Sequence, residues 1–368
     1  MIRFLNNTEI ARPNVERKTS ILAGMSEVLD SGEYISGKYV EEFEKKFAEY
    51  CGGRFCVSVN SGTDALVLSL KSAGIGPGNI VLVPAVSFIA TAFAPLLVGA
   101  RIRFADIDPN TYNIAPDALT SEALEGVAAV IPVHWAGRPV DMEAIGSRLS
   151  GKGISVVEDA AQAAGARYGG RPVGSSGNYT AFSFFPTKNL SCMGDGGAIV
   201  VGNAVDKDKL RLLRNFGRSG REEFLIPGQN SRLDEIQAVV LLEKLKDIER
   251  YNERRREIAA LYDRYLDKDI LRPIPADVPG HAYHLYVVLV PGDRDRIAEE
   301  MLRKGVETAV HYRRSLHEHL RGMGVEFEQS APLRNAEYYS DKCLSLPMYP
   351  YLSEEQVQEV SERLNELI

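Results

Sequence analysis

Residues 55–70 read FCVSVNSGTDALVLSL, five residues typical of a β-strand followed by a helical pattern that begins near Gly62. The next apolar run, IVLVP at residues 80–84, is again followed by a helical pattern at about residues 88–97. Further strand-like runs occur at residues 101–107, 127–133, 154–159, 180–185 and 197–201. Because these strands are apolar throughout, we expect an α/β fold with a mostly parallel central sheet covered by helices on both faces.

The pattern changes after residue 206. We predict helices at 206–216 and at about 232–266, the second longer than a typical helix and therefore expected to bend. The remaining elements are predicted as a strand at 284–290, a helix at 294–304, a strand near 307–310 and a last helix that begins with Ser353 and Gln356 at capping-box spacing. We therefore predict two domains, a large one at residues 1–247 and a smaller α+β domain at residues 248–368.

The composition is that of an ordinary globular protein. The chain has 368 residues, of which 45% are hydrophobic and 25% charged, so it can bury a large core. Its net charge of −7 gives no reason to expect nucleic acid or an anionic membrane as a partner. The one basic cluster, Arg254-Arg255-Arg256, lies between Glu253 and Glu257 and is interpreted as a solvated helix face.

Residues 80–100, the cysteines and the first residues of the chain indicate where in the cell the protein is expected. Residues 80–100 carry no charge, but Pro84 and Pro95 interrupt them, which favours a buried strand and a short core helix over a membrane span. The four cysteines have no metal-ligand or paired spacing, as expected for reduced thiols. The first residues are charged where a signal peptide needs an apolar run. We expect a cytoplasmic protein.

Ser61-Gly62-Thr63 lies where a strand meets a helix. The N–H groups at the start of a helix suit a phosphate, Gly62 permits close approach, and Thr63 adds a hydroxyl, although the same tripeptide also forms ordinary turns and caps. Asp159 ends a strand, where a carboxylate can hold a cationic ring nitrogen or a metal, or can simply cap the next helix. Gln162, three residues later, can face the same ligand.

Lys188 follows a strand in a loop of small residues. Lysine becomes a nucleophile when burial lowers its pKa, but most lysines lie on the surface. Two other motifs are alternatives for function. Asp106 and Asp108 could form a metal–nucleotide pair, as in many glycosyltransferases, although the following Pro109 favours a turn. A zinc site at His311, His317 and His319 is disfavoured by their loose spacing.

The order of the motifs resembles one family, the DegT–StrS group of pyridoxal-phosphate-dependent sugar aminotransferases, which have the fold-type I architecture. The resemblance extends over nearly the whole chain. It is carried by SGEYISGKYVEEFEKKFAEYCG (31–52), NSGTDALVLSL (60–70), VVEDAAQAAGARY (156–168), FSFFPTKNL (182–190), GDGGAIV (194–200) and GQNSRLDEIQAVVLLEKL (228–245).

The resemblance implies a role for each matching residue. Lys188 would form the internal aldimine with pyridoxal 5′-phosphate and shuttle a proton, and Asp159 would pair with the pyridine nitrogen. The other cofactor contacts would be Phe88 stacked on the ring, Gln162 at the ring 3′-oxygen, Gly62, Thr63 and Ser183 at the phosphate, and Asn230 at the phosphate of the neighbouring subunit. The chain would therefore be a homodimer with shared active sites and no catalytic metal.

The resemblance also implies the reaction, a ping-pong transfer of an amino group from L-glutamate to a nucleoside-diphosphate-linked keto sugar for a polysaccharide or an antibiotic. Trp135-Ala136 stands where a leucine-tyrosine pair is frequent, and Arg313 where proline is common, so the sugar is left open. His311 and Tyr312 are candidate substrate contacts or ordinary strand-end residues. The alternatives are amino-cyclitol or amino-acid transamination, a metal-dependent glycosyltransferase, and a sensor that binds the cofactor without turnover.

Overall fold

The computed structural model describes residues 1–267, 270 and 280–368. The α-helices are α1 (Asn7–Glu16), α2 (Lys18–Ser31), α3 (Lys38–Tyr50), α4 (Gly62–Ser72), α5 (Ala90–Leu97), α6 (Met142–Leu149), α7 (Ala204–Leu213), α8 (Glu235–Leu245), α9 (Ile248–Tyr265), α10 (Arg294–Arg303), α11 (Leu316–Gly322), α12 (Arg334–Lys342) and α13 (Glu354–Asn365). Short 3₁₀ turns occupy Pro116–Ala118 and Trp135–Gly137. The strands are β1 (Phe55–Val59), β2 (Ile80–Pro84), β3 (Arg101–Ala105), β4 (Val127–Val130), β5 (Ser155–Asp159), β6 (Arg167–Tyr168), β7 (Arg171–Pro172), β8 (Tyr179–Ser183), β9 (Gly197–Val201), β10 (Tyr286–Leu289), β11 (Glu328–Gln329) and β12 (Cys343–Leu346).

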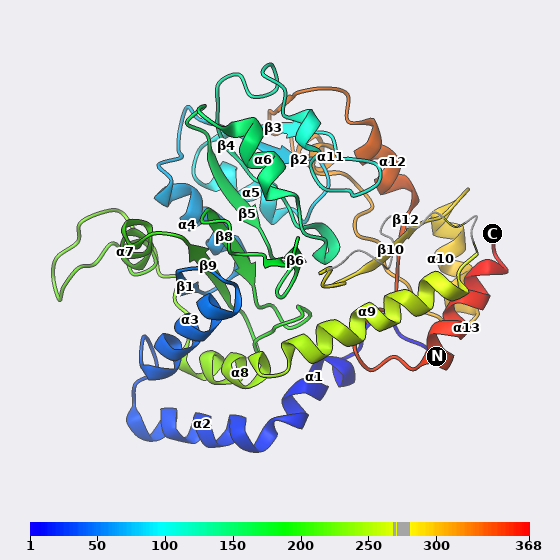
Figure 1. Ribbon diagram of the computed structural model, residues 1–368, viewed down its shortest axis with the longest axis horizontal. Coiled ribbons are helices and arrows are strands. Elements are labelled where there is room, and N and C mark those ends of the chain that lie inside the picture. Colours follow the sequence, from blue (N-terminus) through cyan, green and yellow to red (C-terminus); the bar gives the residue numbers. More distant parts are fainter. Residues whose placement is uncertain (268–269, 271–279) are drawn as a thin grey trace.

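Eight of the strands in the described residues form one central sheet in the order β1-β9-β8-β5-β4-β2-β3-β11 (Figure 1). All neighbours are parallel except β9, which is antiparallel to both β1 and β8. The predicted mixed α/β fold with a mostly parallel sheet is confirmed. In such sheets the carboxyl ends of the parallel strands form the usual position of a binding site.

Helices cover both faces of the sheet, as expected from its apolar strands. On one face α4, α5 and α7 pack against alternate residues of the strands, such as Val57, Val83 and Val157. On the other face α3 and α8 pack near β1, β8 and β9, and α6 packs near β2 and β4. Asp159 belongs to the α4 face, whereas its neighbour Glu158 points to the opposite face because successive strand residues alternate.

Two helix starts fix how the chain enters these layers. Glu235, buried at the start of α8, accepts the backbone N–H groups of Gly37, Tyr39 and Val40 at 2.7, 2.9 and 3.1 Å, so it caps α3 from another helix. The capping box predicted for the last helix is confirmed, since Ser353 bonds to the N–H of Gln356 and the Gln356 side chain accepts the N–H of Ser353.

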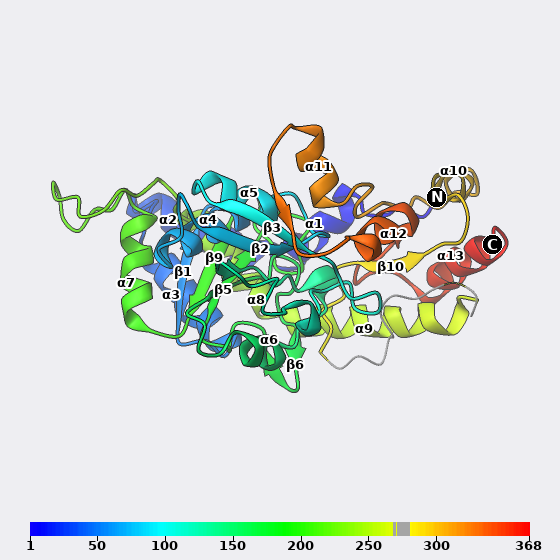
Figure 2. The ribbon, with the colours of Figure 1, turned by 90° about the horizontal axis from the view of Figure 1, so that it is seen from above.

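The region after residue 247 contains the long α9, a two-stranded antiparallel sheet of β10 and β12, and the helices α10 to α13. Figures 1 and 2 place both termini at the end of the molecule that holds α10 and α13. Its short strand β11 pairs with β3 of the central sheet. The domain boundary at residue 248 therefore stays a prediction.

Two predicted elements are wrong in detail. The single long helix at 232–266 is two helices, α8 and α9, which are separated at Lys246 and Asp247, where Asp247 has a φ of −113°. The strand predicted near 307–310 is only an isolated bridge between Ala309 and Ser345. The uncharged segment 80–100 is confirmed as β2 followed by α5. Among the described residues, no helix is both long enough and apolar enough to span a membrane.

Lys244 on α8 is a buried cation. The residue is 4% exposed, and Nζ donates to Ser191 Oγ at 2.7 Å. Burial lowers its pKa from 10.5 to about 8, although the neighbouring Cys192 opposes the shift. The unfolded chain therefore binds the proton more tightly than the folded chain does, so this group lowers stability below pH 8 and the effect disappears as the pH rises toward 10.5.

We expect Lys244→Met to raise the free energy of unfolding by about 2 kcal/mol at pH 7, because the buried charge is removed while the bulk is kept. Denaturant unfolding of both proteins between pH 7 and pH 10 measures the difference, which should shrink as the pH rises. Lys246→Met is the matched control, since Lys246 is exposed and pairs with Glu243, and it should change stability little. A variant no more stable than the wild type at pH 7 would contradict this account.

Candidate active site

The start of α4 forms an anion cradle. Ser61 caps the helix, with its Oγ accepting the N–H of Asp64 at 3.1 Å, which leaves the N–H groups of Gly62 and Thr63 outside the helical hydrogen-bond pattern. A Cβ atom on Gly62 would lie 2.7 Å from Ser183 Cβ, so only glycine lets the end of β8 approach this closely. Helix N–H groups and two hydroxyls therefore converge where a phosphate can bind.

Asp159, at the end of β5, is 6% exposed and held on both oxygens. Its Oδ1 accepts the N–H of Ala161 at 3.1 Å, and its Oδ2 accepts the hydroxyl of Thr91 at 2.7 Å. Thr91 is fully buried on α5 and also lies 2.6 Å from Ser87 Oγ. These bonds fix the carboxylate in one orientation. A carboxylate fixed in this way is suited to bind a cationic group.

Gln162 is oriented by a tight turn. Its Oε1 accepts the backbone N–H of Ala136 at 2.7 Å. Ala136 has a φ of 56°, in the left-handed region that non-glycine residues seldom adopt, and this conformation turns its N–H toward the amide. Burial raises the pKa of Tyr312, and a hydrogen bond with the Gln162 side chain partly opposes that shift.

Lys188 lies in the loop after β8, and its amino group is surrounded by pocket walls. Burial lowers its pKa to about 8, and the Asp159 carboxylate partly opposes that shift. The neutral amine, which is the nucleophilic form, is therefore far more populated near neutral pH than in an ordinary lysine. The sequence left open whether Lys188 is a buried nucleophile or an ordinary surface lysine. The structure places it in a pocket and not on the open surface.

A second wall of the pocket comes from the region after residue 247. His311 Nδ1 lies 2.8 Å from Ser345 Oγ, and the His311 carbonyl accepts the hydroxyl of Tyr339 at 3.0 Å. The Tyr339 hydroxyl in turn accepts Trp135 Nε1–H at 3.1 Å. The ring of Tyr312 lies between those of Trp135 and Phe88, with centroids at 5.5 and 6.0 Å. Trp135, which stands where leucine is frequent in the family, thus stabilises this wall through its contacts with Tyr312 and Tyr339.

These groups line one pocket of about 370 Å³. It contains nine of the ten predicted site residues: Gly62, Thr63, Phe88, Asp159, Gln162, Ser183, Lys188, His311 and Tyr312. The walls thus come from chain segments separated by up to about 250 residues, brought together at the carboxyl ends of β5 and β8. A volume of this size suits a small organic ligand.

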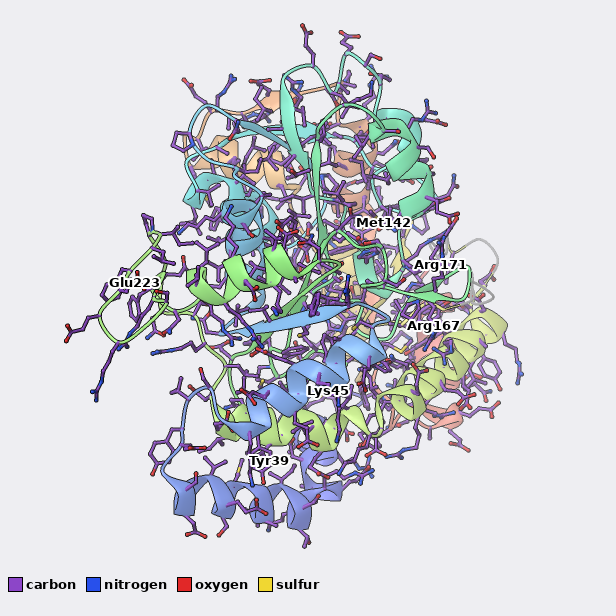
Figure 3. All side chains as sticks on the ribbon, turned by 60° about the vertical axis from the view of Figure 1, so that its left-hand side comes forward. Tyr39, Lys45, Met142, Arg167, Arg171 and Glu223 are labelled. Carbon is purple, nitrogen blue, oxygen red and sulfur yellow. The ribbon has the colours of Figure 1, made fainter. Side chains whose placement is uncertain are left out.

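Asn230 is the predicted site residue that does not line the pocket of its own chain. It is exposed and forms a bridge with Asn215 at the base of residues 216–229. Figure 1 shows this segment projecting from the body beside α7, and Figure 3 shows Glu223 on the projection. The position leaves Asn230 free to face another molecule.

Sequence reasoning missed two residues of the site. Thr91 binds the Asp159 carboxylate across 68 residues of chain, and the only available signal was another hydroxyl residue, Ser87, four positions earlier. His284 lines the pocket and lies 3.2 Å from Asn189 Oδ1, next to Lys188 in sequence. No sequence signal distinguished it from an ordinary residue before a strand.

The other motifs have structural explanations. Asp106 accepts the N–H groups of Asn335 and Ala336, both at 2.9 Å, and Asp108 accepts those of Asn110 and Thr111, both at 2.8 Å. Asp108 therefore holds a backbone turn, as the sequence favoured, whereas Asp106 binds the N-terminal N–H groups of α12. Among the described residues, no group of three or more His, Cys, Asp or Glu side chains is arranged to hold a metal ion.

Comparison with known proteins assigns a family to this arrangement. The DegT/DnrJ/EryC1/StrS aminotransferase family matches residues 16–365. The dTDP-3-amino-3,6-dideoxy-alpha-D-galactopyranose transaminase of Aneurinibacillus thermoaerophilus is 38% identical over 367 residues, which are 99% of each chain. The crystal structure of S. venezuelae DesV in complex with an intermediate has a TM-score of 0.91 and 37% identity, over 97% of this chain and 96% of that one. NtdA from Bacillus subtilis, with bound cofactor PMP, has a TM-score of 0.88 and 29% identity, over 99% of this chain and 85% of that one.

Proposed function

The chain belongs to the DegT/DnrJ/EryC1/StrS aminotransferase family, and from this premise we propose that it transfers an amino group from L-glutamate to a keto sugar linked to a nucleoside diphosphate. The observation that carries the proposal is the presence of Lys188, Asp159 and the α4 cradle in one pocket. The similarity to a transaminase named for a dTDP-linked amino sugar supports the substrate class. The chain is an enzyme, and its proposed acceptor is a sugar nucleotide.

The residues of the pocket fit pyridoxal 5′-phosphate. Gly62, Thr63 and Ser183 would hold the phosphate, because the missing Cβ of Gly62 lets Ser183 lie against the start of α4. Asp159 would face the ring nitrogen and Lys188 the aldehyde carbon, while Phe88 would cover the ring and Gln162 would meet its 3′-oxygen. The bound PMP of the related NtdA supports a cofactor of this type. When bound, this cofactor supplies an electron sink for the carbon that loses its proton.

The chain itself contributes charge and proton transfer. The Asp159 carboxylate, fixed by Thr91 and Ala161, would stabilise a positive charge on the ring nitrogen of the bound cofactor. Lys188 Nζ has a pKa of about 8, so near neutral pH it can both accept a proton from the donor α-carbon and return it.

We propose a homodimer with shared active sites. The support is the projecting segment 216–229 and the exposed Asn230 at its base, which does not line the pocket of its own chain. In a dimer Asn230 would contribute a hydrogen-bond donor to the phosphate held by the other subunit. The donor L-glutamate and the cytoplasmic location are part of the same proposal.

The acceptor wall gives a prediction. Trp135→Phe keeps an aromatic ring but removes the Nε1–H that holds Tyr339 and, through it, the His311 carbonyl. We expect the KM for the sugar nucleotide to rise about tenfold while the reaction with L-glutamate alone changes little. Steady-state kinetics measure the KM for the sugar nucleotide. Single-turnover conversion of the cofactor to its amino form by glutamate measures the first half-reaction alone.

Tyr112→Phe is the matched control for this variant. Tyr112 packs on Tyr339 with ring centroids 4.5 Å apart, and within the described residues its hydroxyl has no hydrogen-bond partner. It should leave the KM unchanged. A Trp135→Phe enzyme that slows both half-reactions equally would show that Trp135 does not act through the acceptor wall.

The proposed function is tested by the visible spectrum of protein supplied with pyridoxal phosphate. We expect the absorption band of the lysine-linked cofactor to convert to that of the amino form with L-glutamate and to return with 2-oxoglutarate. A panel of keto-sugar nucleotides, inososes and 2-oxo acids then identifies the acceptor class. Protein that binds the cofactor but does not respond to any amino donor would favour a sensor, and protein that binds none would contradict the proposal.

A further inference from the structure

His284 lies two residues before the start of β10 and lines the pocket together with Lys188 and His311. The peptide group that precedes His284 is held by α9, because Arg255 donates to the carbonyl of Tyr283 at 3.0 Å. Its ring nitrogen Nδ1 lies 3.2 Å from Oδ1 of Asn189, the residue that follows Lys188. The side chain is thus fixed beside the reactive lysine.

The direction of this hydrogen bond follows from its neighbours. Asn189 Nδ2 donates to the Ala282 carbonyl at 2.9 Å and to Asn252 Oδ1 at 2.8 Å. Asn252, fully buried on α9, donates its own Nδ2 to the Ala164 carbonyl at 3.0 Å. Backbone carbonyls only accept, so both amide orientations are determined. Asn189 must then present its oxygen to His284, and the His284 Nδ1 must carry the hydrogen.

The ring is also kept neutral. Burial lowers the pKa of His284 well below its ordinary value, and the charges of Lys188, Arg255 and His311 act in the same direction. A neutral imidazole has one hydrogen, and here it is on Nδ1, so Nε2 carries a lone pair. Within the described residues no side chain or backbone group donates to this Nε2.

We propose that His284 is a further catalytic residue, whose Nε2 lone pair accepts a hydrogen bond from an N–H of the amino group that reacts in this pocket. The amino group is that of Lys188 or of the incoming amino donor, so the proposal rests on the proposed function. No bond to His284 forms or breaks, and the proton stays on the amine.

The effect of His284 on the amine depends on whether its Nε2 accepts or donates the hydrogen bond. An amine attacks a carbonyl carbon through its nitrogen lone pair. An acceptor at Nε2 binds the amine through one of its N–H bonds, which orients the nitrogen and leaves the lone pair available. The opposite tautomer would point an N–H at the amine and occupy that lone pair. The Asn252–Asn189 relay therefore selects the one form of His284 that assists the attack.

The tautomer can be measured without cofactor, by ¹⁵N NMR of protein labelled at its six histidines. We expect His284 to be neutral with hydrogen on Nδ1 and with an unprotonated Nε2, its signals assigned by their loss in His284→Gln. His281 is an internal reference, because its Nδ1 accepts the N–H of Tyr283 at 2.8 Å and so must show the opposite tautomer. Hydrogen on Nε2 of His284 would overturn the proposal.

The functional part is tested by the rate at which pyridoxal phosphate becomes covalently attached to Lys188, trapped by borohydride and measured by mass. We expect His284→Leu to slow attachment about tenfold. His284→Gln should keep most of the rate, since its side-chain carbonyl can accept the same bond. Thermal unfolding checks that both variants fold. Equal rates for His284→Leu and the wild type would overturn the proposal.

The two measurements also separate this proposal from the proposed function. Wild-type protein that attaches no cofactor would contradict the proposed function, and the NMR result would still decide the arrangement of His284. Attachment that proceeds normally in the wild type and slows only in His284→Leu would support both.

Discussion

Lys188→Ala is expected to reduce amino transfer by about 10⁴-fold or more, because both the nucleophile and the proton carrier of the pocket are removed. The structure gives no substitute for it at this position. His311, another ring in the pocket wall, has a pKa lowered to about 4 by burial and by the Lys188 charge, so it is a poor base at neutral pH. The loss should appear in kcat for every amino donor and acceptor.

The variant should nevertheless bind the cofactor. The α4 cradle and Asp159 do not depend on Lys188, so equilibrium dialysis should show retained, reversible binding, and borohydride should trap no covalent adduct. Lys46→Ala is the control, since Lys46 lies exposed on α3 and pairs with Glu42. A Lys188→Ala enzyme with substantial turnover would contradict the assignment of the reaction to this lysine.

A pH series on the wild type adds a second check. The neutral amine is the reactive form, so the rate of cofactor attachment should rise with pH up to about 8 and then level off. A lysine in open water would instead show a rate that still rises near pH 10.

The sheet was predictable because its strands are short, apolar and separated by helical patterns. The strand at 55–59 and that at 80–84 have the predicted bounds, since each is fully covered by helices and its pattern has one interpretation. The helix at 232–266 was predicted as one element because its sequence has no proline or glycine there. The break at Lys246 and Asp247 depends on tertiary contacts, including the bond from Arg17 to Asp247 at 2.7 Å.

Charge was the least reliable guide to burial. Arg254-Arg255-Arg256 was interpreted as a solvated face, but Arg255 is 6% exposed and donates to the carbonyls of Tyr283 and Met348. Three consecutive residues on a helix point in three directions, so one of them must face inward when the helix is packed on both sides. A guanidinium can donate to several backbone carbonyls at once, which suits it to this buried position.

The site was predictable where one motif supplies both the residue and its surroundings. Ser61-Gly62-Thr63 is a helix start in the sequence and in the structure. Thr91 and His284 were not predictable, because their hydrogen-bond partners are distant in sequence. Asp159 lies 68 residues from Thr91, and Asn189 lies 95 residues from His284. Pairings at such distances follow from the assembled sheet and not from local pattern.

Asp159→Asn is expected to lower kcat by about 10²- to 10³-fold, the size of effect seen when one group that stabilises developing charge is removed. The change tests charge alone. Asparagine has nearly the same shape, its oxygen can accept the N–H of Ala161, and its amide can donate to Thr91, which can then donate to Ser87. The pocket should keep its form, as unfolding by denaturant can verify.

Thr91→Val separates orientation from charge. It removes the hydroxyl that donates to Asp159 at 2.7 Å but leaves the carboxylate in place, so we expect a smaller loss, about tenfold. If the negative charge opposite the ring nitrogen is what matters, Asp159→Asn must be the slower enzyme with both L-glutamate and the keto sugar. Equal losses in the two variants would mean that the hydrogen-bonded position of Asp159, and not its charge, is what the reaction requires.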